Sequence, residues 1–151
     1  MMGKQTMNEL IEKLKVLLAN MSAFRIKAQY YHWNVTGPNF KEYHGLFNDL
    51  YSSANDYVDD IAEHIRALNA FAPGSLSRFK ELSTINDETT IPNAIAMISV
   101  IAMDNKTLHD NMMEIHEVAQ NNKQFGLLNF IEGLLDSNEK TQWMLDSFLK
   151  R

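Results

Sequence analysis

Apolar residues recur every three to four positions along four long segments of this 151-residue chain, and its three prolines fall at the boundaries of those segments. This spacing places the apolar side chains on one face of a helix. It predicts four helices of roughly 25–30 residues, near 6–34, 39–70, 91–120 and 125–149, all longer than the average helix. The second and third are separated by a longer connection with a small helix at 75–82. We therefore predict an all-α four-helix bundle with one crossover.

Three of the helix starts carry capping or proline signals. The signals are Thr6 with Glu9 for the first helix, Asn39 with Glu42 for the second, and Thr89–Pro92 for the third. Gly37 and Pro38 should end the first helix near Asn34. The fourth helix is expected to bury Phe125 and Leu128, although Asn138 and Gln142 interrupt its apolar face.

Composition excludes several classes of protein. The length suits a single domain over residues 1–151. The absence of cysteine excludes a disulfide scaffold, a thiolate zinc site, an iron–sulfur cluster and a cysteine nucleophile. A net charge of −5 makes the chain a poor match to nucleic-acid phosphates. No apolar run has transmembrane length, and residues 1–12 lack a secretory signal, so we expect a cytoplasmic protein without a membrane partner.

The chemistry must come from the five histidines and the acids near them. A ferritin-like bundle binds two metals inside one chain through Glu-x-x-His pairs. None of the five histidines here has a glutamate three positions before it; those positions hold Gln29, Lys41, Ile61, Lys106 and Met113.

The second predicted helix offers a different arrangement. Polar residues form a second stripe, away from its core face: His44, Asn48, Asn55, Asp59 and Glu63. Asp59 and Glu63 are one turn apart, which lets two carboxylates converge on one cation. His44 lies about 22 Å from Asp59 along the helix, so these two residues of one chain cannot share a metal.

His32 precedes the first turn and His44 follows it, so an antiparallel hairpin brings the two to a similar height and lets them converge. Each chain then holds two half-sites, His32 with His44 and Asp59 with Glu63. Two chains paired antiparallel about a two-fold axis would complete two equal sites. Two imidazoles and two carboxylates suit Fe(II) or another first-row metal.

Ordinary structural roles stay open for all of these residues. A histidine among aromatic residues is commonly a packed side chain, and an Asp–Glu pair one turn apart is commonly a solvated face. His64 and Asp60 have the spacing of a surface pair. We expect no metal role for His109 or His116, and we interpret the nine methionines as core residues.

Three stretches closely resemble the Dps family, the mini-ferritins named as DNA-binding proteins from starved cells. They are Tyr31–Phe40 (YHWNVTGPNF), His44–Tyr51 (HGLFNDLY) and Val58–Glu63 (VDDIAE). Glu139–Leu145 (EKTQWML) resembles the final-helix motif of that family. The likeness covers most of the chain, and the first stretch is highly specific.

The resemblance implies a ferritin-like bundle assembled as a hollow homo-dodecamer. It implies oxidation of Fe(II), usually by hydrogen peroxide, with storage of Fe(III) mineral and protection against oxidative stress. Carried over residue by residue, the ferroxidase ligands are His32, His44, Asp59 and Glu63, from two subunits. Trp33 would stand near the site as a radical sink or as a packing residue.

The chain departs from the family pattern in three places. Asn48 stands where many members have an aspartate that helps bind a second iron, and an amide is a weaker, neutral ligand. Aspartates often line an iron-entry pore near the start of the fourth helix, where this chain has Asn121, Asn122 and Asn129, with Glu132 as the nearest acid. The basic tail that often binds DNA is reduced to Lys4 at one end and Lys150 and Arg151 at the other.

Three functions follow as alternatives. The first is a ferroxidase and iron store, for which we expect weak DNA binding. The second is a nucleoid protein that condenses DNA and oxidises iron weakly because of Asn48, although its tails argue against this. The third is a purely structural bundle, against which the histidine and acid stripe argues.

Overall fold

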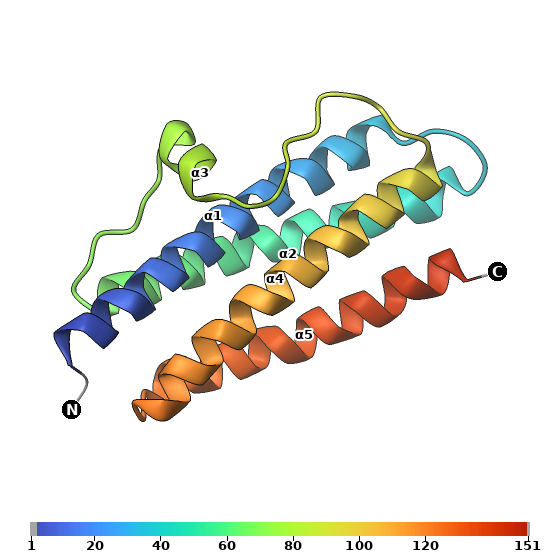
Figure 1. Ribbon diagram of the computed structural model, residues 1–151. Coiled ribbons are helices and arrows are strands. Elements are labelled where there is room, and N and C mark those ends of the chain that lie inside the picture. The colour runs from blue at the N-terminus through green and yellow to red at the C-terminus, as the bar shows by residue number, and fades with distance from the viewer. Residues whose placement is uncertain (1–2, 151) are drawn as a thin grey trace.

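A computed structural model describes residues 3–150, which form five helices. The four long ones are α1 (Lys4–Asn34), α2 (Phe40–Ala67), α4 (Ala94–Asn121) and α5 (Phe125–Leu149), and the short α3 (Leu76–Leu82) lies in the connection between α2 and α4. The helices α1 and α2 form one hairpin and α4 and α5 form another, while the crossover with α3 runs along α1 (Figure 1). The predicted bundle with one crossover and a small extra helix is confirmed.

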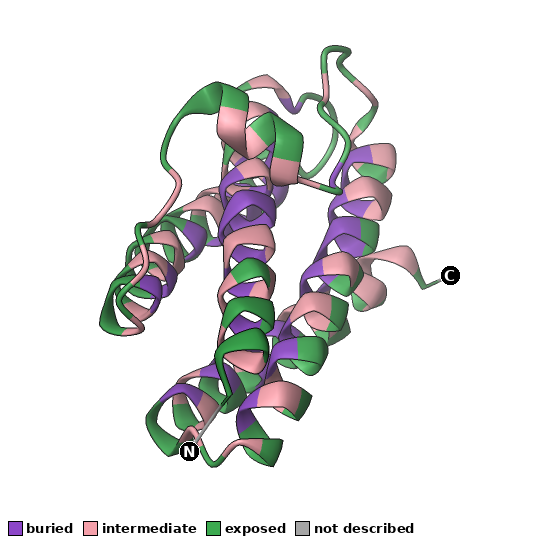
Figure 2. Cartoon of the chain, turned by 60° about the vertical axis from the view of Figure 1, so that its left-hand side comes forward, coloured by how far each residue is buried: buried purple, intermediate pink, exposed green. Residues whose placement is uncertain are grey.

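The core lies along the faces that the four helices turn toward one another (Figure 2). Most apolar residues at the helical spacing of the first two helices are buried, including Leu10, Tyr31, Phe47 and Ile65, whereas Val58 and Leu68 are half-buried. The prediction that Phe125 is buried is wrong, because this residue is 69% exposed. It occupies the first position of α5, before that helix packs on α4. Met103 and Met113 are also exposed, so methionine is not confined to the core.

Two helix starts differ from the sequence prediction. The first helix begins at Lys4 after an extended Gly3, so the predicted capping box of Thr6 and Glu9 lies inside the helix. Lysine and glutamine favour helix, and nothing stops the helix from extending through them. Helix α4, the third of the four long helices predicted, begins after Asn93, whose side chain accepts a hydrogen bond from the Ala96 amide at 2.9 Å. Asparagine is a strong N-cap, and the stretch ending at Pro92 therefore precedes the cap instead of starting the helix.

The turn between α1 and α2 sets the height of the candidate site. The first helix ends at Asn34, as predicted, and Gly37 has a φ of 101°, which glycine adopts without strain. Asn39 is the residue before α2, also as predicted, but its φ of 64° is left-handed and its side chain makes no capping bond. Asparagine tolerates this conformation better than most residues. The turn is therefore short enough to hold His32 and His44 side by side.

Of the three basic residues that the sequence analysis found near the two ends of the chain, Lys4 is the first residue of α1 and Lys150 follows α5. Arg151 lies outside the described residues. None of the helices within residues 3–150 combines the length and the apolar character that crossing a membrane requires.

Candidate metal centre

His32 and His44 are in contact at the closed end of the α1–α2 hairpin. Their ring centroids are 3.9 Å apart and the rings are nearly parallel, with an interplanar angle of 20°. The sequence predicted that these two side chains converge, and the structure confirms the convergence. Their role as metal ligands stays a prediction.

The backbone fixes which nitrogen of each ring is free. Nδ1 of His32 lies 2.8 Å from the carbonyl oxygen of His44, and Nδ1 of His44 lies 2.8 Å from the carbonyl oxygen of His32. A carbonyl oxygen only accepts hydrogen bonds, so each Nδ1 carries the hydrogen and donates it. In the neutral ring Nε2 then keeps its lone pair, which is the state that binds a metal.

Three carboxylates gather near the other end of α2. Asp59, Asp60 and Glu63 are exposed, and one oxygen of each lies within 4.8 Å of the others. A hydrogen bond to Asp59 and the negative charge of Asp59 raise the pKa of the Glu63 carboxyl. The three negative charges lie close together, and a cation bound among them would relieve their repulsion. The sequence paired Asp59 with Glu63 but missed that Asp60, the next residue in the chain, reaches the same place.

The histidines and the carboxylates remain separate within one chain. Within residues 3–150, Asp59, Asp60 and Glu63 are the one set of three or more potential ligands that cluster, and no histidine joins them. The helix rise of about 22 Å between His44 and Asp59 accounts for this separation. The histidine pair offers only nitrogen ligands and the carboxylate group only oxygen ligands, so neither by itself gives the mixed set of imidazoles and carboxylates predicted from the sequence.

Two neighbours of the histidine pair escaped the sequence analysis. Phe40 stacks on His44, with ring centroids 5.0 Å apart, and Tyr51 packs on His32 at 5.3 Å. Tyr51 lies two turns after His44 on the same helix, so the helical period already placed it near the stripe. Trp33 is 65% exposed on the described chain, so it does not pack in the core of this bundle, and its role near the site stays a prediction.

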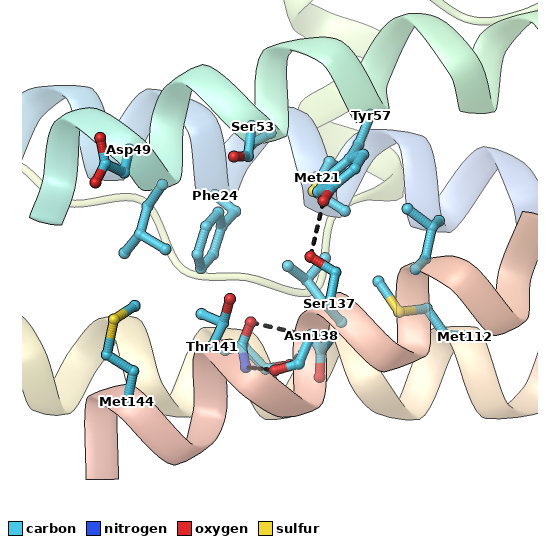
Figure 3. Close-up of a pocket in the computed structure, with 15 residues that line it drawn as sticks. Met21, Phe24, Asp49, Ser53, Tyr57, Met112, Ser137, Asn138, Thr141 and Met144 are labelled. Carbon is cyan, nitrogen blue, oxygen red and sulfur yellow. Dashed lines mark hydrogen bonds between the residues drawn. The ribbon is translucent and has the colours of Figure 1, made fainter. Parts of the chain in front are cut away.

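The centre of the bundle contains a cavity of about 180 Å³ between α1, α2, α4 and α5 (Figure 3). Figure 3 shows the Tyr57 and Ser137 hydroxyls bridging α2 and α5 at 2.8 Å beside this cavity. The residues that line it include one carboxylate, Asp49, and no histidine. This lining lacks the carboxylate–histidine pairs that a ferritin-like bundle uses to bind two metals inside one chain.

The other three histidines have partners of their own. His109 and His116 on α4 each contact a glutamate on α5, at 2.9 Å to Glu139 and 3.0 Å to Glu132. Glu132, the acid nearest the expected pore, is therefore engaged by His116. The charge of Asp60 acts on His64, but no ion pair within 4.0 Å joins these two residues among residues 3–150, so the predicted surface pair is at most a loose one. His64 is half-buried and stacks on Phe130 at 4.2 Å, and burial lowers its pKa.

A four-helix bundle with one long crossover is the architecture of the ferritin-like proteins. The family model described as a ferritin-like domain matches residues 11–151. DNA protection during starvation protein 2 of Bacillus anthracis is 29% identical over 143 residues, covering 95% of this chain and 98% of that protein.

Solved structures show the same relationship. Antigen TpF1 from Treponema pallidum superposes with a TM-score of 0.97 and 26% identity, covering 100% of this chain and 97% of that chain. A Dps protein from Vibrio cholerae O1, described as a member of a broad superfamily of ferritin-like diiron-carboxylate proteins, has a TM-score of 0.94 at 26% identity, with 99% and 94% covered. The chain therefore belongs to the ferritin-like family, among its Dps proteins.

Proposed function

We propose that this chain forms a closed cage, a dodecamer as in the family it resembles, that oxidises Fe(II) and stores the ferric product. The observation that carries this proposal is the histidine pair, whose two Nδ1 atoms are held by carbonyl oxygens, while no hydrogen bond to either Nε2 atom is found within residues 3–150. Packing of two histidine rings does not require the backbone to hold the same nitrogen of both rings, whereas binding of a metal by both Nε2 atoms does benefit from it. Membership of the ferritin-like family supports iron as the metal.

The proposed site is shared between two subunits. His32 and His44 of one chain would meet Asp59 and Glu63 of its partner across a two-fold axis, because one chain cannot bring the two groups together. The residues present suit Fe(II): two neutral imidazoles and two carboxylates are typical ligands for it. Asp60 lies close enough to Asp59 and Glu63 to add to the negative charge that attracts the cation.

Fe(II) is the substrate, and hydrogen peroxide is the proposed oxidant. Two Fe(II) ions each lose one electron to one peroxide molecule, whose O–O bond breaks, and two protons complete two molecules of water. The side chains hold the iron during this reaction and are not themselves oxidised. Consuming Fe(II) and peroxide together limits the formation of hydroxyl radicals, which is the proposed protection against oxidative stress. Action in the cytoplasm, the location expected from the sequence, stays part of the proposal.

Condensation of DNA is the second candidate, supported by the name of the Bacillus anthracis relative. The net charge of −5 and the few basic residues near the two ends of the chain oppose it. We therefore place DNA binding second and expect it to be weak.

The test is anaerobic loading of the assembled protein with Fe(II), followed by a pulse of hydrogen peroxide while ferric absorbance is recorded. We expect fast oxidation and a soluble ferric product that elutes with the protein. A matched variant, His109→Ala, removes a histidine outside the proposed site and should oxidise iron at the wild-type rate. Oxidation no faster than in buffer, or equal loss in the His109→Ala and His32→Ala variants, would overturn the proposal.

A further inference from the structure

Four aromatic rings form one continuous column at the closed end of the α1–α2 hairpin. In order they are Phe40, His44, His32 and Tyr51, and consecutive ring centroids are 5.0, 3.9 and 5.3 Å apart. Three of the rings come from α2 and one from α1, so the ring column joins the two helices. Both histidines lie inside it, and the two carbocyclic rings close its ends.

The ring column leaves one edge of each imidazole free. His44 stacks on two rings, Phe40 and His32, whereas His32 stacks on His44 and is contacted by the ring of Tyr51, which is tilted by 55°. The Nδ1 edge of each imidazole is engaged by a backbone carbonyl oxygen at 2.8 Å. Each imidazole therefore has two ring neighbours and one engaged nitrogen, and Nε2 is the nitrogen that remains for a ligand.

Contacts with neighbouring rings help to hold the imidazole in place, because a histidine ring rotates easily about its side-chain bonds. The torsion that rotates the imidazole about the Cβ–Cγ bond has broad, roughly two-fold minima. A single hydrogen bond sets the tautomer but permits the ring to rock about it, whereas contacts with two neighbouring rings restrict that motion. Ligands held in the binding geometry before the metal arrives lose less conformational entropy on binding.

We propose that Phe40 and Tyr51 are positioning residues for the metal site and act through the rings of His44 and His32. This inference rests on the proposed function, since it assumes that the histidines bind a metal. Tyr51 is half-buried, and no hydrogen bond of its hydroxyl to the protein is found within residues 3–150. The aromatic ring of Tyr51, and not its hydroxyl group, is therefore what holds His32.

The experiment measures Co²⁺ binding by the assembled protein, from the visible absorption of the bound ion, and needs no turnover of iron. We expect Tyr51→Leu to weaken Co²⁺ binding about tenfold or more, the loss seen when a partner that orients a metal ligand is removed. Tyr51→Phe keeps the ring and should bind within about twofold of the wild type. Phe40→Leu should weaken binding in the same direction, with less effect because Phe40 is partly exposed.

Tyr57→Leu is the matched control. Tyr57 is another half-buried tyrosine on α2, but its contact is the Ser137 hydroxyl on α5 and not a histidine ring. It should keep the wild-type affinity for Co²⁺. Light scattering checks that each variant assembles as the wild type does, so that a lost interface is not mistaken for a lost ring contact.

The outcomes separate this inference from the function on which it rests. Wild-type affinity in an assembled Tyr51→Leu protein would overturn the positioning role and leave the proposed metal site intact. Equal loss in Tyr51→Phe and Tyr51→Leu would overturn it too, because the hydroxyl group would then be the essential part. A wild-type protein that binds no Co²⁺ would contradict the metal site itself and this inference with it.

Discussion

The ammonium of Lys27 on α1 lies 2.7 Å from a carboxylate oxygen of Asp104 on α4, and these side chains are only 5% and 12% exposed. Burial raises the pKa of the Asp104 carboxyl, and the hydrogen bond and charge of Lys27 oppose that rise. Two helices that are far apart in the sequence are therefore joined by an ion pair that neither apolar pattern predicts. A buried charge is tolerated only while its partner is present.

Lys27→Met should destabilise the protein by about 3–5 kcal/mol, since it leaves Asp104 buried without a counter-charge. The double variant Lys27→Met/Asp104→Leu should lose much less stability, because both buried charges are then absent. Denaturant unfolding at one fixed protein concentration measures both free energies of unfolding. A double variant as unstable as Lys27→Met would show that packing, and not the unpaired charge, causes the loss.

The stability of the crossover should depend on pH through Glu88. The Tyr31 hydroxyl donates a 2.6 Å hydrogen bond to Glu88, and this bond is the main reason that the pKa of the Glu88 carboxyl lies below its usual 4.5. A lowered pKa stabilises the folded state above the pKa of the unfolded chain, and that stabilisation is lost as the pH falls through the folded value.

Wild type should therefore be more stable than Tyr31→Phe at pH 7, and the difference should narrow as the pH falls below about 4.5. Denaturant unfolding of both proteins at several pH values between 3 and 7 measures this difference in the free energy of unfolding. A difference that stays constant over this range would show that the Tyr31 hydroxyl does not act through the Glu88 carboxylate.

Recovery of activity in mixed assemblies tests whether the metal site is shared. One variant lacks His32 and His44, and the other lacks Asp59 and Glu63; each alone should lose fast Fe(II) oxidation. When the two are unfolded together and refolded, a mixed pair collects both defects at one site and an intact ligand set at the other. With random pairing, about a quarter of all sites should recover.

The control assembles the two variants separately and mixes them afterwards, and this mixture should stay inactive. Activity there would indicate exchange of subunits between cages. No recovery in a correctly assembled mixed cage would exclude the shared site, because a site within one chain cannot be rebuilt by mixing.

Asn48→Asp should increase the amount of Fe(II) bound per chain. Asn48 lies one turn after His44 on α2, where an aspartate would place a negative, stronger oxygen ligand beside the histidines. Anaerobic Fe(II) titration by calorimetry measures the stoichiometry for both proteins. If the stoichiometry is unchanged, Asn48 does not limit binding of a second iron.

Binding to DNA should be weak near neutral pH. An assembly of chains that each carry a net charge of −5 repels the phosphate backbone. A gel-shift titration with plasmid at moderate salt should show little retention. Tight binding without added Mg²⁺ would mean that the basic side chains gather on one outer surface strongly enough to outweigh the net charge.

Polar residues on the core faces show why sequence patterns go only part of the way. Asn138 interrupts the apolar face of α5, yet it is buried. Its side-chain amide donates to the backbone carbonyl of Asn105 on α4, and the Asn105 amide donates to the Asn138 carbonyl, both at 3.1 Å. Asn20 is likewise buried and holds the crossover through Ser83 and Thr84. Helical period describes one helix at a time, so it cannot show that a polar residue has its partner on another helix.

The sequence by itself determined the four long helices, the single crossover and the meeting of His32 with His44. Each of these depends on the period of one segment or on the length of one turn, which are local properties. Only the tertiary structure decided that the two imidazoles stack, that backbone carbonyls leave both Nε2 atoms free, and that Phe40 and Tyr51 close the ring column. Those features depend on the relative rotation of two packed helices, which the contacts of the whole bundle fix and no single helix encodes.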